Sequence, residues 1–120
     1  MIRTIFCASV LAFAIAPVTS VAQSNSEPLG PEDRMLLRCS AAFALVAHGQ
    51  ETGTAEALAF PPLAEDGRDY FVRASAKVMD DAGLDRDAIS AALAAEAQDM
   101  VDNDTVTDVA RACLPMLSTQ

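Results

Sequence analysis

The sequence predicts an all-α fold: a small bundle of four main helices plus one short helix, closed by a single disulfide, after a cleaved signal peptide. Three observations lead to this prediction. Apolar residues recur every three or four positions, no useful stretch alternates apolar and polar residues as a half-buried strand does, and Gly, Asp and Thr stand at the ends of the periodic segments. In a chain of 120 residues, these segments fit one helical domain.

The first 22 residues have the layout of an export signal. Arg3 gives a short basic start, residues 5–16 form an apolar run, and Ser20 and Ala22 are small residues that suit a cleavage site. The apolar run is shorter than the roughly 20 residues that a membrane-spanning helix needs. We therefore expect a Sec-type signal peptide over residues 1–22, cleavage near Ala22, and a periplasmic or secreted protein that is not stably inserted in a membrane.

The first helix of the mature chain is expected between Gly30 and Gly49. Residues 23–29 before it are polar and without periodicity, so they predict a flexible leader, and the helical domain then covers residues 30–120. Gly30 can serve as the N-cap, Pro31 suits the first helical position, and Gly49 is expected to supply the left-handed stop. The apolar stripe is wide and consists of Met35, Leu36, Leu37, Cys39, Ala42, Phe43, Leu45 and Val46. Such a helix should be central and contacted from several sides.

A short helix is expected after Thr54, and the prolines that follow Phe60 should end it. The segment Phe60, Pro61, Pro62 and Leu63 is the most apolar non-helical piece of the mature chain. Two interpretations are open. The segment covers one end of the helical core as a lid, or it is an exposed candidate interaction patch for a protein partner.

Two further helices are expected to form an antiparallel hairpin over about residues 66–101. The first presents an apolar row that we expect to be Phe71, Ala74, Val78 and Ala82, broadened by Tyr70, Val72 and Met79. Gly83 should stop it, and Asp85 should cap the next helix. Leu84 and Ile89 flank this cap at the spacing of a hydrophobic staple.

The last helix is expected to begin at Thr105, with Asp108 completing a capping box, and to end where Pro115 removes a donor. Its apolar face carries Cys113. Because Cys7 lies inside the signal peptide, the mature chain retains two cysteines, Cys39 and Cys113. In an oxidising compartment two such cysteines are expected to pair, and the alternative is two free thiols with a redox role.

The composition argues against several classes of function. The formal charge is −9, and removing residues 1–22 takes away Arg3 and makes it −10. The basic residues are scattered, so nucleic acid is not an expected partner. A protein partner is possible.

No catalytic set or cofactor site is apparent in the sequence. His48 is the only histidine, and nine helical residues, about 13 Å, separate it from Cys39. Residues 102–113 resemble a calcium-binding loop at first, but Thr107 replaces its glycine and Cys113 its final glutamate. We therefore predict no catalytic residues, no metal site, no cofactor and no enzyme activity.

Three short motifs carry a resemblance to other proteins. They are R-C-S-A-A-F at residues 38–43, V-M-D-D-A-G-L at 78–84 and C-L-P-M-L at 113–117. With these motifs the chain resembles uncharacterised small exported all-helical proteins of alphaproteobacteria, and the resemblance implies a compartment and a fold. In architecture alone it is similar to the acid-stress periplasmic chaperones.

Together these observations favour an acidic, non-enzymatic exported protein with a binding, envelope-stress or chaperone-like role. The alternatives are a subunit or inhibitor of a larger exported complex and, less favoured, a thiol-dependent or hydrolytic enzyme.

Overall fold

The computed structural model describes residues 29–118 of the chain. The expected signal peptide and all of the expected leader except Leu29 lie outside these residues. The elements are α1 (Pro31–Thr52), α2 (Ala55–Leu58), α3 (Asp66–Ala82), α4 (Arg86–Asp102), α5 (Val106–Cys113) and the 3-10 helix η1 (Leu114–Leu117). The all-α fold of four main helices and one short helix is therefore confirmed.

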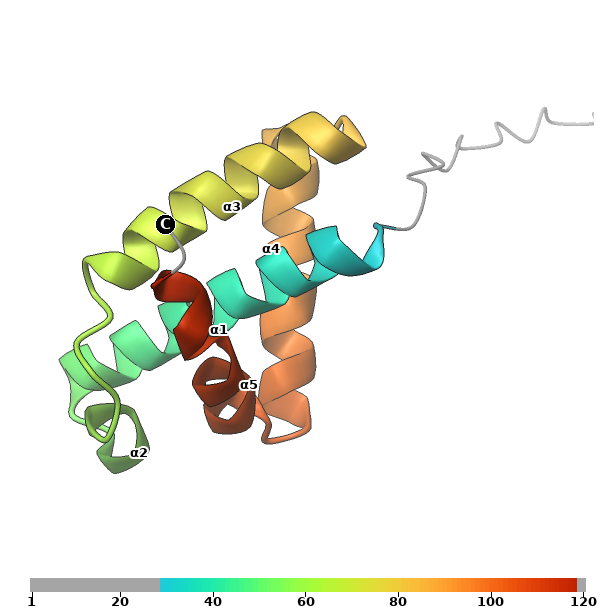
Figure 1. The fold of residues 1–120 in the computed structure, drawn as a ribbon. Coiled ribbons are helices and arrows are strands. Elements are labelled where there is room, and N and C mark those ends of the chain that lie inside the picture. The colour runs from blue at the N-terminus through green and yellow to red at the C-terminus, as the bar shows by residue number, and fades with distance from the viewer. Residues whose placement is uncertain (1–28, 119–120) are drawn as a thin grey trace, which may run out of the picture.

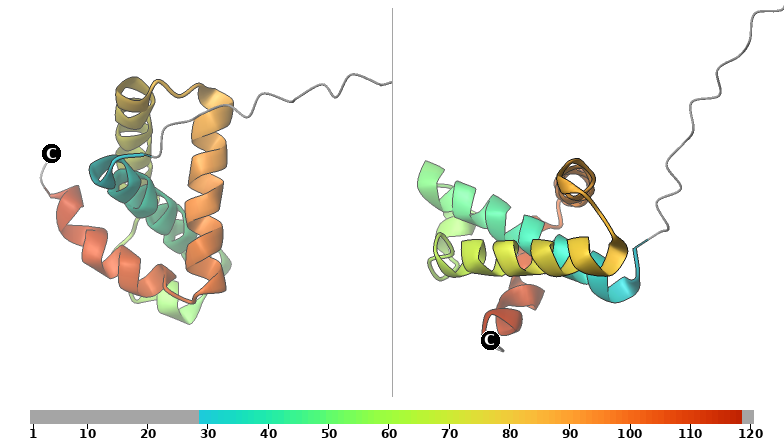
Figure 2. Two further views of the ribbon diagram at one scale, coloured as in Figure 1. Left: turned by 90° about the vertical axis from the view of Figure 1, so that its right-hand side faces the viewer. Right: turned by 90° about the horizontal axis from the view of Figure 1, so that it is seen from above.

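Helix α1 is the central element of the fold. It contacts α2, α3, α4 and α5, and no other helix of the described region touches as many. The chain runs in opposite directions along α1 and α3, which lie side by side, whereas α4 crosses α1 steeply (Figure 1). Two further views show α5 and η1 on the side of α1 away from α4 (Figure 2). One long helix thus holds together elements that are far apart in the sequence.

The start of α1 agrees with the sequence, but its end does not. Gly30 is the N-cap, its carbonyl accepts from the Arg34 amide at 3.0 Å, and Pro31 is the first helical residue. Gly49 is not the stop, because α1 continues to Thr52 and Gly53, with φ 80°, ends it. Gly49 instead lies where α1 and α2 are in contact, and a Cβ at this position would lie 2.7 Å from the Cβ of Ala57. The glycine allows α2 to approach α1 closely.

The wide apolar stripe of α1 is buried or, at Leu36 and Leu45, partly buried, and only Met35 among its members is exposed. Leu37, Cys39, Ala42, Phe43 and Val46 are buried, and Ser40 between them donates its hydroxyl to the Leu36 carbonyl oxygen at 2.7 Å. Met35 was expected in the same stripe, but its side chain is 52% exposed. It lies near the start of α1, where it lines a surface hollow with Arg38 and with Glu96 of α4.

The expected hairpin of α3 and α4 is confirmed with its turn. Gly83 has φ 64° and ends α3, and the Asp85 carboxylate accepts from the Ala88 amide at 2.8 Å as the N-cap of α4. Leu84 and Ile89 both belong to a small core cluster around Leu37 and Val78. The hairpin is thereby joined to the N-terminal half of α1.

The buried face of α3 is rotated slightly from the expected one. Gly67, Tyr70, Ala74 and Val78 are buried, whereas Val72 is 60% exposed and Ala82 is also exposed. A Cβ on Gly67 would lie 3.3 Å from the Cβ of Phe43, so the glycine brings α3 close to α1. This close approach decides which row of α3 turns inward.

Helix α5 begins where expected but without the expected capping box. Thr105 is the N-cap residue, yet its side chain caps no amide, and its Oγ1 is buried without a partner among the described residues. Asp108 is exposed and pairs with Arg111 at 3.8 Å instead. In a regular capping box a glutamate or glutamine at this position reaches back to the N-cap amide. Asp108 has a shorter side chain than these residues. Pro115 ends the α-helix, as expected, and the chain tightens into η1.

Candidate functional site

The predicted disulfide is present and lies in the centre of the fold. Cys39 of α1 and Cys113 of α5 are bonded, with their Cα atoms 5.6 Å apart and their side chains 1% and 5% exposed. The bond closes a loop of 75 residues. Its position between the first and last helices makes it a structural crosslink, buried from solvent reagents.

Aromatic and sulfur groups surround this disulfide. The Met116 Sδ lies 3.5 Å from the Cys39 Sγ, and the Tyr70 hydroxyl donates to the same Sδ at 3.7 Å. Tyr70 also meets Phe43 edge to face, with 5.3 Å between ring centroids. Burial raises the pKa of the Tyr70 hydroxyl above its ordinary value of 10.0. These contacts tie η1 and α3 to the centre of α1.

The Phe60, Pro61, Pro62 and Leu63 segment lies over the core as a lid. Phe60 and Leu63 are 8% and 1% exposed, whereas Pro61 and Pro62 face solvent. The four residues therefore do not form one continuous exposed patch, because two of their side chains are used in the core. The prolines and the neighbouring Leu58, which is 58% exposed, remain at the surface.

One side chain, Gln50 of α1, holds the lid in place. Its Nε2 donates to the carbonyl oxygens of Ala57, Phe60 and Pro61 at 3.1, 3.3 and 2.9 Å, and its Oε1 accepts from the Leu63 amide at 3.0 Å. A loop of this kind has few backbone partners of its own, so its polar groups need partners from elsewhere. No local signal in the sequence points to Gln50, since a lone glutamine within a helix belongs to no recognisable motif.

Two adjoining hollows, which we call the lid groove, run beside the lid. The first, of about 240 Å³, lies between α1 and α3, and the second, of about 360 Å³, lies between α1 and the lid. Both are lined by Ala47 and Ala64. The remaining apolar lining is Phe43, Ala44, Leu63 and Phe71 in the first and Leu58, Phe60 and Pro62 in the second. Arg68 lines the first hollow and Glu51 the second, so the groove is an apolar surface with one charge of each sign.

A larger cavity, which we call the end pocket, lies between the end of α1, α2 and the start of α5. It has a volume of about 480 Å³. Its apolar lining is Leu45, Val46, Ala57, Phe60 and Val106, and its polar side chains are His48, Thr52, Thr54, Glu56, Asp104 and Thr107. His48 is exposed, and it lies within α1 rather than at its end because the helix continues to Thr52. The end pocket thus combines five apolar side chains, three of them buried, with six polar ones.

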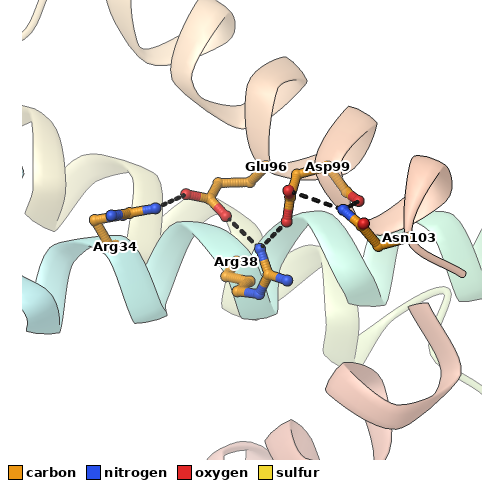
Figure 3. A network of polar contacts seen from close by, with 5 residues as sticks. All are labelled: Arg34, Arg38, Glu96, Asp99 and Asn103. Atoms are coloured by element: carbon orange, nitrogen blue, oxygen red, sulfur yellow. Dashed lines mark hydrogen bonds and ion pairs between the residues drawn. The ribbon is translucent and has the colours of Figure 1, made fainter. Parts of the chain in front are cut away.

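A polar network joins α1 to α4 on the other side of the core (Figure 3). The Arg38 Nη1 lies 2.8 Å from both the Glu96 Oε2 and the Asp99 Oδ2, and the Arg34 Nη2 lies 3.6 Å from the Glu96 Oε1. Asn103 donates its Nδ2 to the Asp99 Oδ1 at 3.1 Å. The hydrogen bonds to Asp99 and Glu96 raise the pKa of the Arg38 guanidinium. Every charge in this network has a partner, so it serves to orient α4 across α1.

Residues 29–118 contain no group of three or more His, Cys, Asp or Glu side chains placed to hold a metal ion. The same residues include no helix that is both long and apolar enough to cross a membrane. No protein-family model matches the chain, and no curated protein or solved structure is significantly similar to it.

Proposed function

We propose that this chain acts after export as a non-enzymatic binding protein, in an envelope-stress or chaperone-like role, and holds an apolar segment of another polypeptide in the lid groove. The observation that carries the proposal is that two apolar hollows adjoin, share Ala47 and Ala64, and continue onto the exposed Leu58. Adjoining concave surfaces with apolar lining can receive the apolar side chains of a ligand. An extended or helical segment would place successive apolar side chains in the two hollows.

The rigid setting of the groove supports this proposal. Its floor is α1, its α3 wall is held close by Gly67, and its lid wall is fixed by the four hydrogen bonds of Gln50. A wall that is already ordered costs less conformational entropy when a ligand binds. After removal of residues 1–22 the formal charge is −10, which keeps copies of the protein apart while apolar surface is exposed.

Filling the groove tests the proposal. Ala64 is exposed and lines both hollows, so Ala64→Glu puts a carboxylate into the groove without disturbing the core. Ala94→Glu is the matched control, since Ala94 is exposed on α4. The assays are Nile red fluorescence and the turbidity of a test protein diluted from guanidinium chloride. We expect the wild type and Ala94→Glu to bind the dye and suppress turbidity, and Ala64→Glu to lose both effects.

Equal behaviour of the two variants, or a wild type without either effect, would overturn the proposal. Circular dichroism of both variants verifies that the fold is kept. The alternative, a subunit or inhibitor of a larger exported complex, predicts a single partner in constant proportion instead of many unfolded ones. Crosslinking followed by mass spectrometry distinguishes the two.

Export is tested separately by the mass of the processed protein. Cleavage after Ala22 leaves Gln23 as the first residue. Recovery of the full-length chain from the cytoplasm, with Met1 or Ile2 at its N-terminus, would contradict this part of the proposal.

A further inference from the structure

The end pocket lies apart from the lid groove and has no role in the function proposed above. The short helix α2 stands between the two: Ala57 lines the end pocket, Leu58 lines the groove, and Phe60 contributes to both. At about 480 Å³ the end pocket is within the range of roughly 300–1,000 Å³ in which proteins bind small molecules. Its floor is apolar, so it can hold a hydrocarbon chain.

The charges around the end pocket are negative and lack compensation. Glu56 of α2 and Asp104 of the α4–α5 turn both line it, and neither forms an ion pair within residues 29–118. The two residues come from separate elements and line the same cavity. Asp104 has φ 55°, a left-handed conformation that is uncommon for a residue other than glycine. This conformation ends α4, since the Thr105 amide donates to the Met100 carbonyl oxygen at 2.9 Å, and it leaves Asp104 in the lining of the cavity.

The end of α1 adds to the same negative potential. The last turn of α1 carries Glu51 and no basic residue, although a helix C-terminus favours positive charge. Arg111 is a basic group near this side, where its guanidinium lies 5.8 Å from the centre of the Phe60 ring, but it is paired with Asp108 at 3.8 Å. A positive group entering the end pocket would therefore meet two acidic residues that have no cationic partner within residues 29–118.

We propose that the end pocket binds an organic monocation, an ammonium or guanidinium group carried on an apolar chain. The chain lies on Leu45, Val46 and Val106, and the cation lies between Glu56 and Asp104. Hydroxyl groups of Thr52 and Thr107 line the same cavity and accept hydrogen bonds from its N–H groups. The cation could belong to a free amine or to the lysine side chain of a polypeptide, which share this chemistry.

Titrations followed by amide NMR spectra test this proposal, with hexylammonium as the probe and hexanol and hexanoate as its neutral and anionic counterparts. We expect hexylammonium to shift the amide signals of Gly49, Thr52, Thr54 and Val106 in a saturable manner. Hexanol should bind at least about five-fold more weakly, and hexanoate more weakly still, since each lacks the attraction to two carboxylates. Added salt should weaken the binding of hexylammonium.

Two charge-matched double variants provide the decisive comparison. Glu56→Gln with Asp104→Asn should weaken hexylammonium binding about five-fold or more, whereas Asp80→Asn with Asp87→Asn, at exposed carboxylates around the α3–α4 turn, should leave it unchanged. Equal weakening in both, or equal binding of hexanol and hexylammonium, overturns the proposal.

A lysine residue blocked at both termini identifies the source of the cation. Binding by the blocked lysine points to a polypeptide side chain, and binding by hexylammonium alone points to a free amine. Ala64→Glu should not alter either titration, so a failure of the lid groove proposal and a failure of this one are distinguished.

Discussion

The carboxamide of Gln50 and the main-chain amide of Leu63 are joined by a 3.0 Å hydrogen bond that fastens the lid to α1. The same side chain satisfies three carbonyl oxygens of the segment from Ala57 to Pro61. Leu63 is 1% exposed, so this bond orients a residue of the core as well as a loop. The lid wall of the groove therefore depends on one residue of the central helix.

Replacing Gln50 with Ala should loosen the lid. The change leaves the Leu63 amide and the Phe60 and Pro61 carbonyl groups without their Gln50 partner, whereas the Ala57 carbonyl keeps its bond from the Phe60 amide, so we expect the free energy of unfolding to fall by about 1–3 kcal/mol. Hydrogen exchange at the Leu63 amide should become much faster. Gln98→Ala is the control, since Gln98 makes one exposed side-chain bond to Asp102 and its loss should cost under about 0.5 kcal/mol. An unchanged exchange rate at Leu63 would show that the lid is held by other contacts.

Replacing Gly49 with Ala should not bring the stabilisation that is usual within a helix. In an open helix Gly→Ala gains about 1 kcal/mol, but here the new Cβ would lie 2.7 Å from that of Ala57 and α2 must move. We expect lower stability and shifted amide signals in α2. Combining it with Ala57→Gly should give a coupling of about 1 kcal/mol in denaturant unfolding. Simple additivity of the two changes would contradict the close contact.

Removing the disulfide should cost a large part of the stability. In the chain-entropy account, opening a loop of 75 residues corresponds to about 4 kcal/mol. We expect Cys39→Ala with Cys113→Ala to lower the denaturant midpoint strongly. In the native wild type neither cysteine should react with an alkylating reagent. Alkylation of the folded protein without reductant would instead favour the thiol-dependent alternative.

Replacing Arg38 with Met should weaken the attachment of α4 to α1. Arg38 contacts both Glu96 and Asp99 at 2.8 Å, so we expect its replacement to lower the free energy of unfolding by about 1 kcal/mol. This difference from the wild type should become smaller at high salt, because salt screens the ion pairs. Arg34→Met is matched in chemistry, but the Arg34 side chain is 66% exposed and lies 3.6 Å from Glu96. The Arg34→Met variant should therefore lose much less unfolding free energy than Arg38→Met. Equal losses in the two variants would mean that general charge, and not the network, is responsible.

The ionisation of Tyr70 should be linked to unfolding in alkali. Burial raises the pKa of this hydroxyl in the folded state, so its contribution to stability is present below the unfolded value of about 10 and is lost as pH rises through the folded value. Tyr70 is the only tyrosine and the chain has no tryptophan, so absorbance near 295 nm follows this group alone. We expect tyrosinate to appear at a higher pH than in the unfolded chain.

Comparing Tyr70→Phe with the wild type isolates this contribution. Lys77, whose pKa is raised by its hydrogen bond to Asp81, gives a loss of stability of the same sign in alkali. In Tyr70→Phe the free energy of unfolding should therefore still decrease as pH rises in the alkaline range. The decrease should be smaller than in the wild type, because the contribution of Tyr70 is absent. Identical pH profiles of stability for the two proteins would contradict burial as the cause of the raised pKa.

The sequence by itself determined the helical class, most helix ends and the disulfide. These features depend on local or compositional signals: Pro31 at a first helical position, Gly83 and Asp85 around a turn, and two cysteines outside the predicted signal peptide. The helix-end signals depend on neighbouring residues in the sequence and the cysteine signal on composition. Both can therefore be recognised without knowing which helices pack against each other. The exported location and the absence of enzyme activity remain predictions.

Tertiary contacts decided the remainder. Gly49 was expected to stop a helix and instead admits a neighbouring one, while Met35 and Val72 fit an apolar period but remain largely exposed. The lid groove and the end pocket each combine residues from α1, from the α2 and lid region and from a later helix, and Gln50 acts through four groups between 7 and 13 positions away. Close approach and burial depend on which surfaces meet, and the periodicity of one helix carries no information about its neighbour.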